Sequence, residues 1–143
     1  MRMLSKLVLL STIVVSGAAV AEDSVPDLRG TWVVIGEGMR IDTADKTSIP
    51  LDTESTVVID WQEGSRISGY EVDQKSVNDA PDPAMADEVI AGVFGPDNIV
   101  YMTDENGFRD CWIESAETMR CVYRHALADR TVVSFGVWTK QPQ

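Results

Sequence analysis

The feature that most constrains this chain is an alternation of apolar and polar residues that begins after Pro26. A period of two residues is typical of β-strands that bury one face. The alternating segments predict eight strands, over residues 30–37, 55–62, 66–73, 88–94, 99–104, 108–114, 118–125 and 131–140. No segment has the longer apolar period of an extended amphipathic helix. The sequence therefore predicts an all-β protein.

Most connections between these segments are short and rich in turn-forming residues, at 63–64, 95–98, 105–107 and 115–117. Such loops join antiparallel neighbours, so the strands should pair in sequence order. Two connections, 38–54 and 74–87, are predicted to be long loops. A meander of eight strands leaves two free edges, and closure removes them. We predict an eight-stranded antiparallel up-and-down β-barrel, with an open sandwich of the same strands as the alternative.

Strand parity predicts which side chains face the interior of the barrel. The expected inward set is Val57, Ile59, Trp61, Ser68, Tyr70, Val72, Ala91, Val93, Val100, Met102, Arg109, Cys111, Ile113, Met119, Cys121, Tyr123 and His125. The expected outward or solvated set is Thr56, Asp60, Gln62, Glu71, Glu88, Asp104, Asp110, Arg120 and Arg124. Because one register gives an apolar interior over six strands, the pattern supports closure around a single core.

The N-terminus has the three parts of a secretory signal peptide. Arg2 and Lys6 precede an apolar run over 7–15, and Ala19 and Ala21 form an A-x-A cleavage site. The apolar run is shorter than the roughly 20 residues of a membrane-spanning helix. We expect cleavage after Ala21, which leaves one domain over 22–143 in the periplasm or outside the cell, without membrane insertion.

The charge and the cysteines bound the possible partners. Loss of Arg2 and Lys6 with the signal peptide leaves 10 basic and 23 acidic side chains, a net charge of −13 that disfavours nucleic acid. Cys111 and Cys121 lie opposite each other if 115–117 is a three-residue loop, so an exported protein should join them by a disulfide. Two buried free thiols are the alternative. No spacing of metal ligands and no catalytic motif is present, so we expect neither a cofactor nor an enzyme.

The segment Leu28-Arg29-Gly30-Thr31-Trp32 resembles the Gly-x-Trp opening of lipocalins and the Gly-Thr-Trp opening of avidin-like proteins, together the calycin barrels. The lipocalin resemblance implies a tryptophan that plugs the closed end of the barrel and an arginine from the last strand that packs across it. Here Trp32 and Lys140 take those places, with lysine where the family pattern has arginine. The resemblance also implies a small ligand inside the barrel, although the specificity for biotin or retinol does not carry over.

Strand directions divide the predicted interior into two rims. The open rim, the candidate ligand site, comprises Tyr70, Val72, Val89, Met102, Arg109, Tyr123 and His125. The closed rim comprises Trp32, Trp61, Ile113 and Met119, with Lys140 beside Trp32. Arg109 could hold the anionic end of a mostly apolar ligand by paired hydrogen bonds. The alternative leaves Arg109 and His125 in water at the rim, with Tyr70 and Tyr123 as core residues.

A second function class remains open on the outer face of the barrel. The apolar residues expected there are Ile99, Tyr101, Phe108, Trp112 and Val122. On adjacent strands they would form an exposed apolar patch, which is typical of a protein interface or a homodimer. A barrel filled by its own side chains would favour this protein-interaction module, and an internal cavity would favour the ligand carrier.

Overall fold

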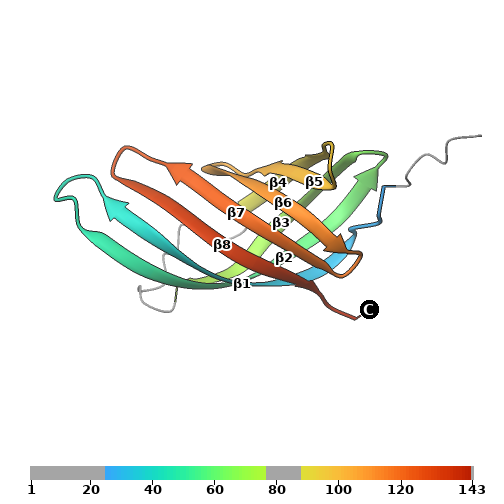
Figure 1. The fold of residues 1–143 in the computed structure, drawn as a ribbon, viewed down its shortest axis with the longest axis horizontal. Coiled ribbons are helices and arrows are strands. Elements are labelled where there is room, and N and C mark those ends of the chain that lie inside the picture. The colour runs from blue at the N-terminus through green and yellow to red at the C-terminus, as the bar shows by residue number, and fades with distance from the viewer. Residues whose placement is uncertain (1–24, 77–87, 143) are drawn as a thin grey trace, which may run out of the picture.

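A computed structural model describes residues 25–76 and 88–142, so the predicted signal peptide and its cleavage site lie outside the described residues. Eight strands form one sheet that closes on itself, and each strand pairs antiparallel with its neighbours in sequence order (Figure 1). The strands are β1 Gly30–Asp42, β2 Ser48–Glu63, β3 Arg66–Ser76, β4 Glu88–Phe94, β5 Ile99–Thr103, β6 Gly107–Ser115, β7 Thr118–Ala126 and β8 Arg130–Lys140. The predicted up-and-down barrel is confirmed, and the sandwich is excluded. In the part of the chain that the structure covers, no helix is long and apolar enough to cross a membrane.

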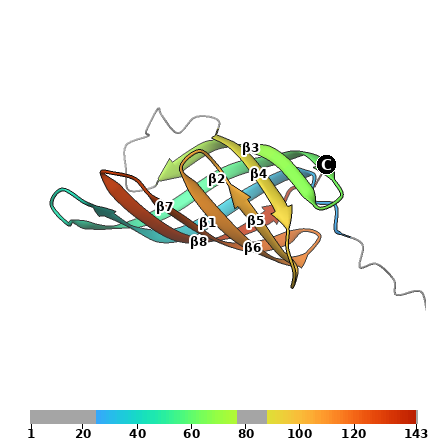
Figure 2. The same cartoon turned by 90° about the horizontal axis from the view of Figure 1, so that it is seen from above.

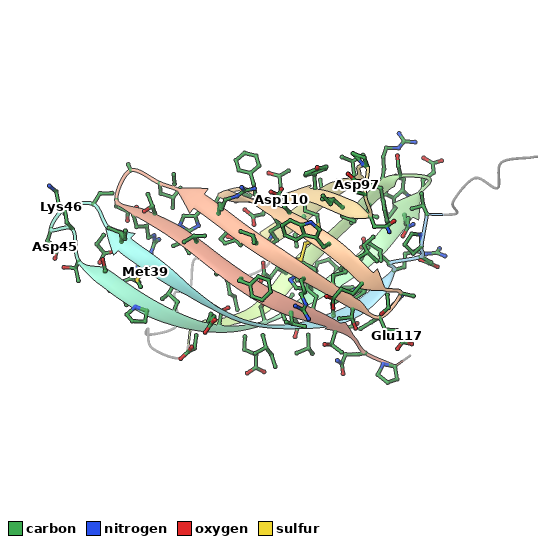
Figure 3. All side chains as sticks on the ribbon, in the orientation of Figure 1. Met39, Asp45, Lys46, Asp97, Asp110 and Glu117 are labelled. Atoms are coloured by element: carbon green, nitrogen blue, oxygen red, sulfur yellow. A yellow bond between two sulfur atoms is a disulfide. The ribbon has the colours of Figure 1, made fainter. Side chains whose placement is uncertain are left out.

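The first predicted long loop is largely β-structure. Strands β1 and β2 stay paired from Trp32 opposite Val57 out to Ile41 opposite Ser48. Only a short turn follows, in which Lys46 has a left-handed backbone (φ 61°). The long β1–β2 hairpin extends the barrel wall at one end, and Figure 3 labels Asp45 and Lys46 at its tip. The prediction of a loop over 38–54 is wrong. Both strands continue through this segment, and its many polar residues obscure the alternation of inward and outward side chains in the sequence.

Glycines let the long strands approach closely where the wall bends. A Cβ atom at Gly36 would lie only 2.6 Å from the backbone oxygen of Phe135 on β8, and one at Gly38 would lie 2.5 Å from that of Val133. No other residue type tolerates such contacts without a shift of the backbone. These two positions therefore allow β1 and β8 to complete the barrel side by side.

One end of the barrel is closed by the segment that leads into β1. Leu28 is fully buried, and the Gln62 side chain holds its backbone by accepting a hydrogen bond from Leu28 N (2.8 Å) and donating one to Pro26 O (2.9 Å). The C-terminus lies at the same end in both views (Figures 1 and 2). We call this the closed end.

Trp32 packs beneath this plug and is fully buried. Its indole Nε1 donates a hydrogen bond to Leu28 O at 2.9 Å. The Lys140 ammonium lies 5.6 Å from the centroid of the Trp32 ring and donates to Asp27 O at 3.1 Å. Lys140 therefore covers the tryptophan and ties the N-terminal segment to the last strand, through a cation–π contact that is weaker than a stacked guanidinium would make.

The apolar core fills the half of the barrel next to the plug. Trp138 on β8 is almost fully buried in it, a core position that the sequence analysis did not identify. The core comprises Leu28, Trp32, Val34, Val57, Ile59, Ile67, Ile90, Val100, Met102, Cys111, Met119, Cys121 and Trp138, with Ile113 packed against it. The interior is therefore largely occupied by side chains on this side.

Cys111 on β6 and Cys121 on β7 face each other across the strand pair and are joined by a disulfide. Replacing both with alanine should lower the free energy of unfolding by about 2–3 kcal/mol. The bond closes a short loop and so reduces the conformational entropy of the unfolded chain, which folding must otherwise overcome. Urea unfolding of the wild type, the double variant and the reduced wild type measures this effect. Identical midpoints for all three would contradict it.

Candidate functional site

A bulge in β2 reverses the predicted faces of β3. The pairing of β2 with β3 shifts by one residue between Ile59 and Trp61, and such a shift moves the following side chains to the other face. Tyr70, predicted inside, is 38% exposed, whereas Glu71, predicted outside, is only 4% exposed. Val72 shares the outer face with Tyr70, and Trp61 is 44% exposed instead of lining the closed end. These face assignments are therefore wrong.

The β4–β5 hairpin differs from the prediction by one residue as well. Val100 pairs with Phe94, so it does not share the inner face with Val93 as predicted, because the turn between the strands contains two left-handed residues, Asp97 and Asn98 (φ 60° and 57°). A turn of this kind changes the register of the strands that it joins. The observed register points Glu88 and Ile90 inward and leaves Val89, Ala91 and Val93 exposed on the outside.

The corrected faces bring three carboxylates to Arg109 inside the barrel. Arg109 on β6 is buried, and its Nη2 donates to the Glu71 carboxylate on β3. Its Nη1 lies 2.6 Å from Asp104 Oδ2, and the Asp104 side chain is fully buried. The predicted solvation of Glu71 and Asp104 is therefore wrong. A buried guanidinium needs such partners, since an unpaired buried charge is costly.

The loop between β5 and β6 fixes the other carboxylates. Asp104 Oδ1 accepts hydrogen bonds from the backbone N–H groups of Asn106 (2.9 Å) and Gly107 (2.6 Å), which hold the carboxylate at the strand end. The Asn106 amide donates to Glu88 Oε1 at 2.9 Å, so Glu88 is buried on β4 and is not solvated as predicted. We call Glu71, Glu88, Asp104 and Arg109 the inner ionic cluster.

The inner ionic cluster has more acidic than basic groups. Carboxylate oxygens of Glu71, Glu88 and Asp104 lie within 4.8 Å of one another. Burial raises the pKa of Glu88, and the charges of Asp104 and Glu71 raise it further, against the hydrogen bond from Asn106. Oxygen ligands of this kind suit a hard cation, but the Arg109 guanidinium already provides a positive charge among them. The cluster is explained as an internal ion pair network.

Two polar side chains on β7 lie next to this cluster. The Arg109 guanidinium carbon is 4.6 Å from the centroid of the Tyr123 ring. The Tyr123 hydroxyl is 3.0 Å from His125 Nδ1, and the two rings meet edge to face at 5.5 Å. His125 is only 8% exposed, and its Nε2 is buried without a hydrogen-bond partner among the described residues. A buried polar atom of this kind calls for a water or a ligand.

Burial also shifts the pKa values of Tyr123 and His125. Burial lowers the pKa of His125, and the positive charge of Arg130 lowers it further. The negative charges of Asp104 and Asp129 raise this pKa but do not outweigh the other two effects. Burial likewise raises the pKa of Tyr123, so the hydroxyl keeps its proton. The pair is therefore neutral at neutral pH.

The inner wall becomes accessible to solvent beyond Tyr123 and His125. In the barrel register, Tyr123 lies opposite Ser134, His125 opposite Val132, and Ser134 opposite Gly38. These inward positions on β1 and β8 are only half-buried, unlike the apolar core below them. We call this end, next to the β1–β2 hairpin, the open end.

The predicted site residues thus separate into three places. Tyr70, Val72 and Val89 lie on the outer face, and Met102 belongs to the buried core. Arg109, Tyr123 and His125 come together on the inner wall, beside three carboxylates that sequence reasoning missed. These carboxylates could have been inferred from Arg109, because an arginine predicted to lie inside a barrel requires acidic partners there.

No family model matches the chain, and no curated protein matches its sequence. Three solved structures are similar in fold. A redesigned β-barrel, b11L5F_LGL, is 9% identical over 80% of this chain and 92% of its own, with a TM-score of 0.46. EF1p2_mFAP2b, described as bound to DFHBI, is 12% identical over 80% and 94%, with a TM-score of 0.48. The S-type phycobiliprotein lyase CPES from Guillardia theta is 6% identical over 80% and 89%, with a TM-score of 0.49. The strand pairing of the chain itself confirms the closed barrel that the calycin resemblance implies, and membership of the calycin family stays a prediction.

Proposed function

We propose that this chain is an exported binding protein, not an enzyme, that takes a small, mostly apolar molecule into the barrel through its open end. The molecule would rest on the apolar core and meet Tyr123 and His125 on the inner wall. The observation that carries the proposal is the buried His125 Nε2, which has no partner in the part of the chain described. Inside an otherwise well-packed barrel, such a group supports a convergent polar contact to a ligand.

Arg109 plays a different part from the one that the sequence suggested. Its guanidinium already pairs with Glu71 and Asp104, and Glu88 lies within the same cluster. An anionic group brought to Arg109 would therefore meet carboxylates at contact distance, where repulsion is strong. We infer that Arg109 supports the Tyr123 ring and does not hold an anionic ligand.

Two neighbouring residues on β8 test where a ligand binds. Ser134 faces inward at the open end, whereas Val133 is exposed on the outer face. Ser134→Trp should abolish binding of the uncharged fluorescent dye phenylnaphthylamine, because the indole would occupy the space inside the open end of the barrel. Val133→Trp adds the same indole outside and should leave dye binding unchanged. Equal dye titrations for the two variants, or no enhancement of fluorescence with the wild type, would contradict internal binding.

A second candidate function rests on the outer face. The predicted patch is exposed at Tyr101, Phe108 and Trp112, and half-buried at Ile99 and Val122. Cross-strand pairing extends it: Val122 lies beside Phe135, and Val137 beside Ile35, which is 64% exposed. We call the surface made by these residues on β5, β6, β7, β8 and β1 the outer apolar face. Exposed apolar residues gathered on one face in this way favour an interface.

The partner that this face fits best is a second copy of the chain. Its apolar residues are interspersed with charges of both signs, since Asp110 and Arg124 form an ion pair on it and Arg120 lies nearby. A surface with both signs is complementary to itself under two-fold symmetry, whereas a strongly acidic partner or a strongly basic one would match only half of it.

Sedimentation velocity tests this second function. The wild type should sediment as a dimer at micromolar concentration, and Phe135→Lys should shift it to monomer, because the new charge is desolvated in the middle of the apolar contact. Val89→Lys is the matched control, since Val89 is exposed on β4 outside the outer apolar face. A monomeric wild type, or equal effects of the two lysines, would contradict the dimer.

A further inference from the structure

The hydrogens of Tyr123 and His125 define what the unpartnered nitrogen can do. A neutral phenol has one hydrogen to donate, and a neutral imidazole has one. The 3.0 Å contact between the Tyr123 hydroxyl and His125 Nδ1 uses only one of them. If Tyr123 donates to Nδ1, the remaining hydrogen is on Nε2. If Nδ1 donates to Tyr123, both the phenol hydrogen and Nε2 are left without a partner among the described residues. The first arrangement leaves fewer groups unsatisfied and is therefore favoured.

We propose that Tyr123 fixes His125 in the Nε2–H form, so that the barrel receives an uncharged oxygen acceptor, such as a ketone or amide carbonyl, on a small apolar molecule. This inference rests on the proposed function and adds the class of ligand. The residue that recognises the acceptor is His125, and Tyr123 is a positioning residue.

The charges around the pair distinguish this class from its rivals. Arg40 and Arg130 also face the inner wall near His125, but each forms an ion pair with an acidic neighbour, Asp42 and Asp129. They therefore do not offset the inner ionic cluster, which holds three carboxylates against one guanidinium. A carboxylate ligand would be repelled by that excess of negative charge. An ammonium group carries hydrogens but no acceptor, so it cannot satisfy an N–H donor. A neutral carbonyl oxygen accepts the hydrogen bond without either cost.

Nuclear magnetic resonance tests the tautomer without any ligand. His125 is the only histidine of the chain, so its ring signals in a long-range ¹H–¹⁵N spectrum are unambiguous. We expect the Nε2–H form in the wild type at neutral pH. Tyr123→Phe should give a mixture of tautomers, whereas Tyr101→Phe, a matched change on the outer face, should not. A wild-type spectrum of the Nδ1–H form would overturn the inference.

Displacement of bound phenylnaphthylamine tests the ligand class. A long-chain methyl ketone should bind about three- to tenfold more tightly than the alkane, carboxylate or amine of the same length, the gain expected from one neutral hydrogen bond. His125→Leu should remove this preference while it leaves alkane binding intact. Equal displacement by ketone and alkane, or strongest displacement by the carboxylate, would overturn the inference but leave internal binding standing. Failure of every compound to displace the dye would instead contradict the proposed function.

Discussion

Arg109→Met should lower the free energy of unfolding by about 3–5 kcal/mol, the usual cost of removing one partner from a buried ion pair. Arg109 is the only arginine within hydrogen-bonding or ion-pair distance of Glu71 and Asp104 among the described residues. Without it, buried carboxylates would remain with no compensating charge. Urea unfolding followed by tryptophan fluorescence measures the loss at neutral pH.

The pH dependence of this loss has a definite sign. Burial raises the pKa of Glu88 in the same cluster, and removal of the Arg109 charge takes away one of the effects that lower it. Because this pKa is raised in the folded state, Glu88 contributes stability at low pH that is lost as the pH rises through its folded pKa. The destabilisation of Arg109→Met should therefore shrink as the pH falls toward 4. Arg120→Met is the control, because Arg120 forms only an exposed ion pair with Glu114, worth about 0–1 kcal/mol. Similar losses for Arg109 and Arg120 would contradict the inner ionic cluster.

Trp32→Ala should cost about 3–5 kcal/mol of unfolding free energy, the typical loss for a large aromatic core residue. The substitution leaves a cavity under the plug, removes the hydrogen bond to Leu28 O and deprives Lys140 of its ring contact. Chemical unfolding at neutral pH measures the loss.

Trp61→Ala provides the comparison for this prediction, since Trp61 is 44% exposed whereas Trp32 is fully buried. Its removal should cost less than about 1 kcal/mol. If Trp32→Ala proved equally mild, the closed end would not depend on the packing of Trp32 against Leu28.

The sequence predicted the barrel because its signals were local and repeated. The period of two, the short turns and the need to close two edges do not depend on any single residue. The prediction was accurate from β5 to β7, where short loops let parity run from Arg109 through Cys121 to His125 without interruption. The Cys111–Cys121 disulfide followed from that register.

The polar residues of the interior could not be predicted in the same way, because one extra residue in a strand moves the side chains that follow it to the opposite face of the sheet. The bulge after Ile59 turned Glu71 inward and Tyr70 outward, and nothing in the local pattern marks it, since Tyr70 is the more apolar choice. Left-handed residues at Asp97 and Asn98 had the same effect on β4. The carboxylates that neutralise Arg109 were therefore assigned to solvent.

Internal binding of a small molecule is tested most directly by native mass spectrometry of the protein isolated gently from the cells that naturally make it. We expect a folded species whose mass exceeds that of the chain by one small uncharged organic molecule, which is released on denaturation and is absent from Ser134→Trp expressed in the same cells. The bare mass of the chain for the wild type, together with no binding of phenylnaphthylamine, would contradict internal binding and leave the outer apolar face as the functional surface.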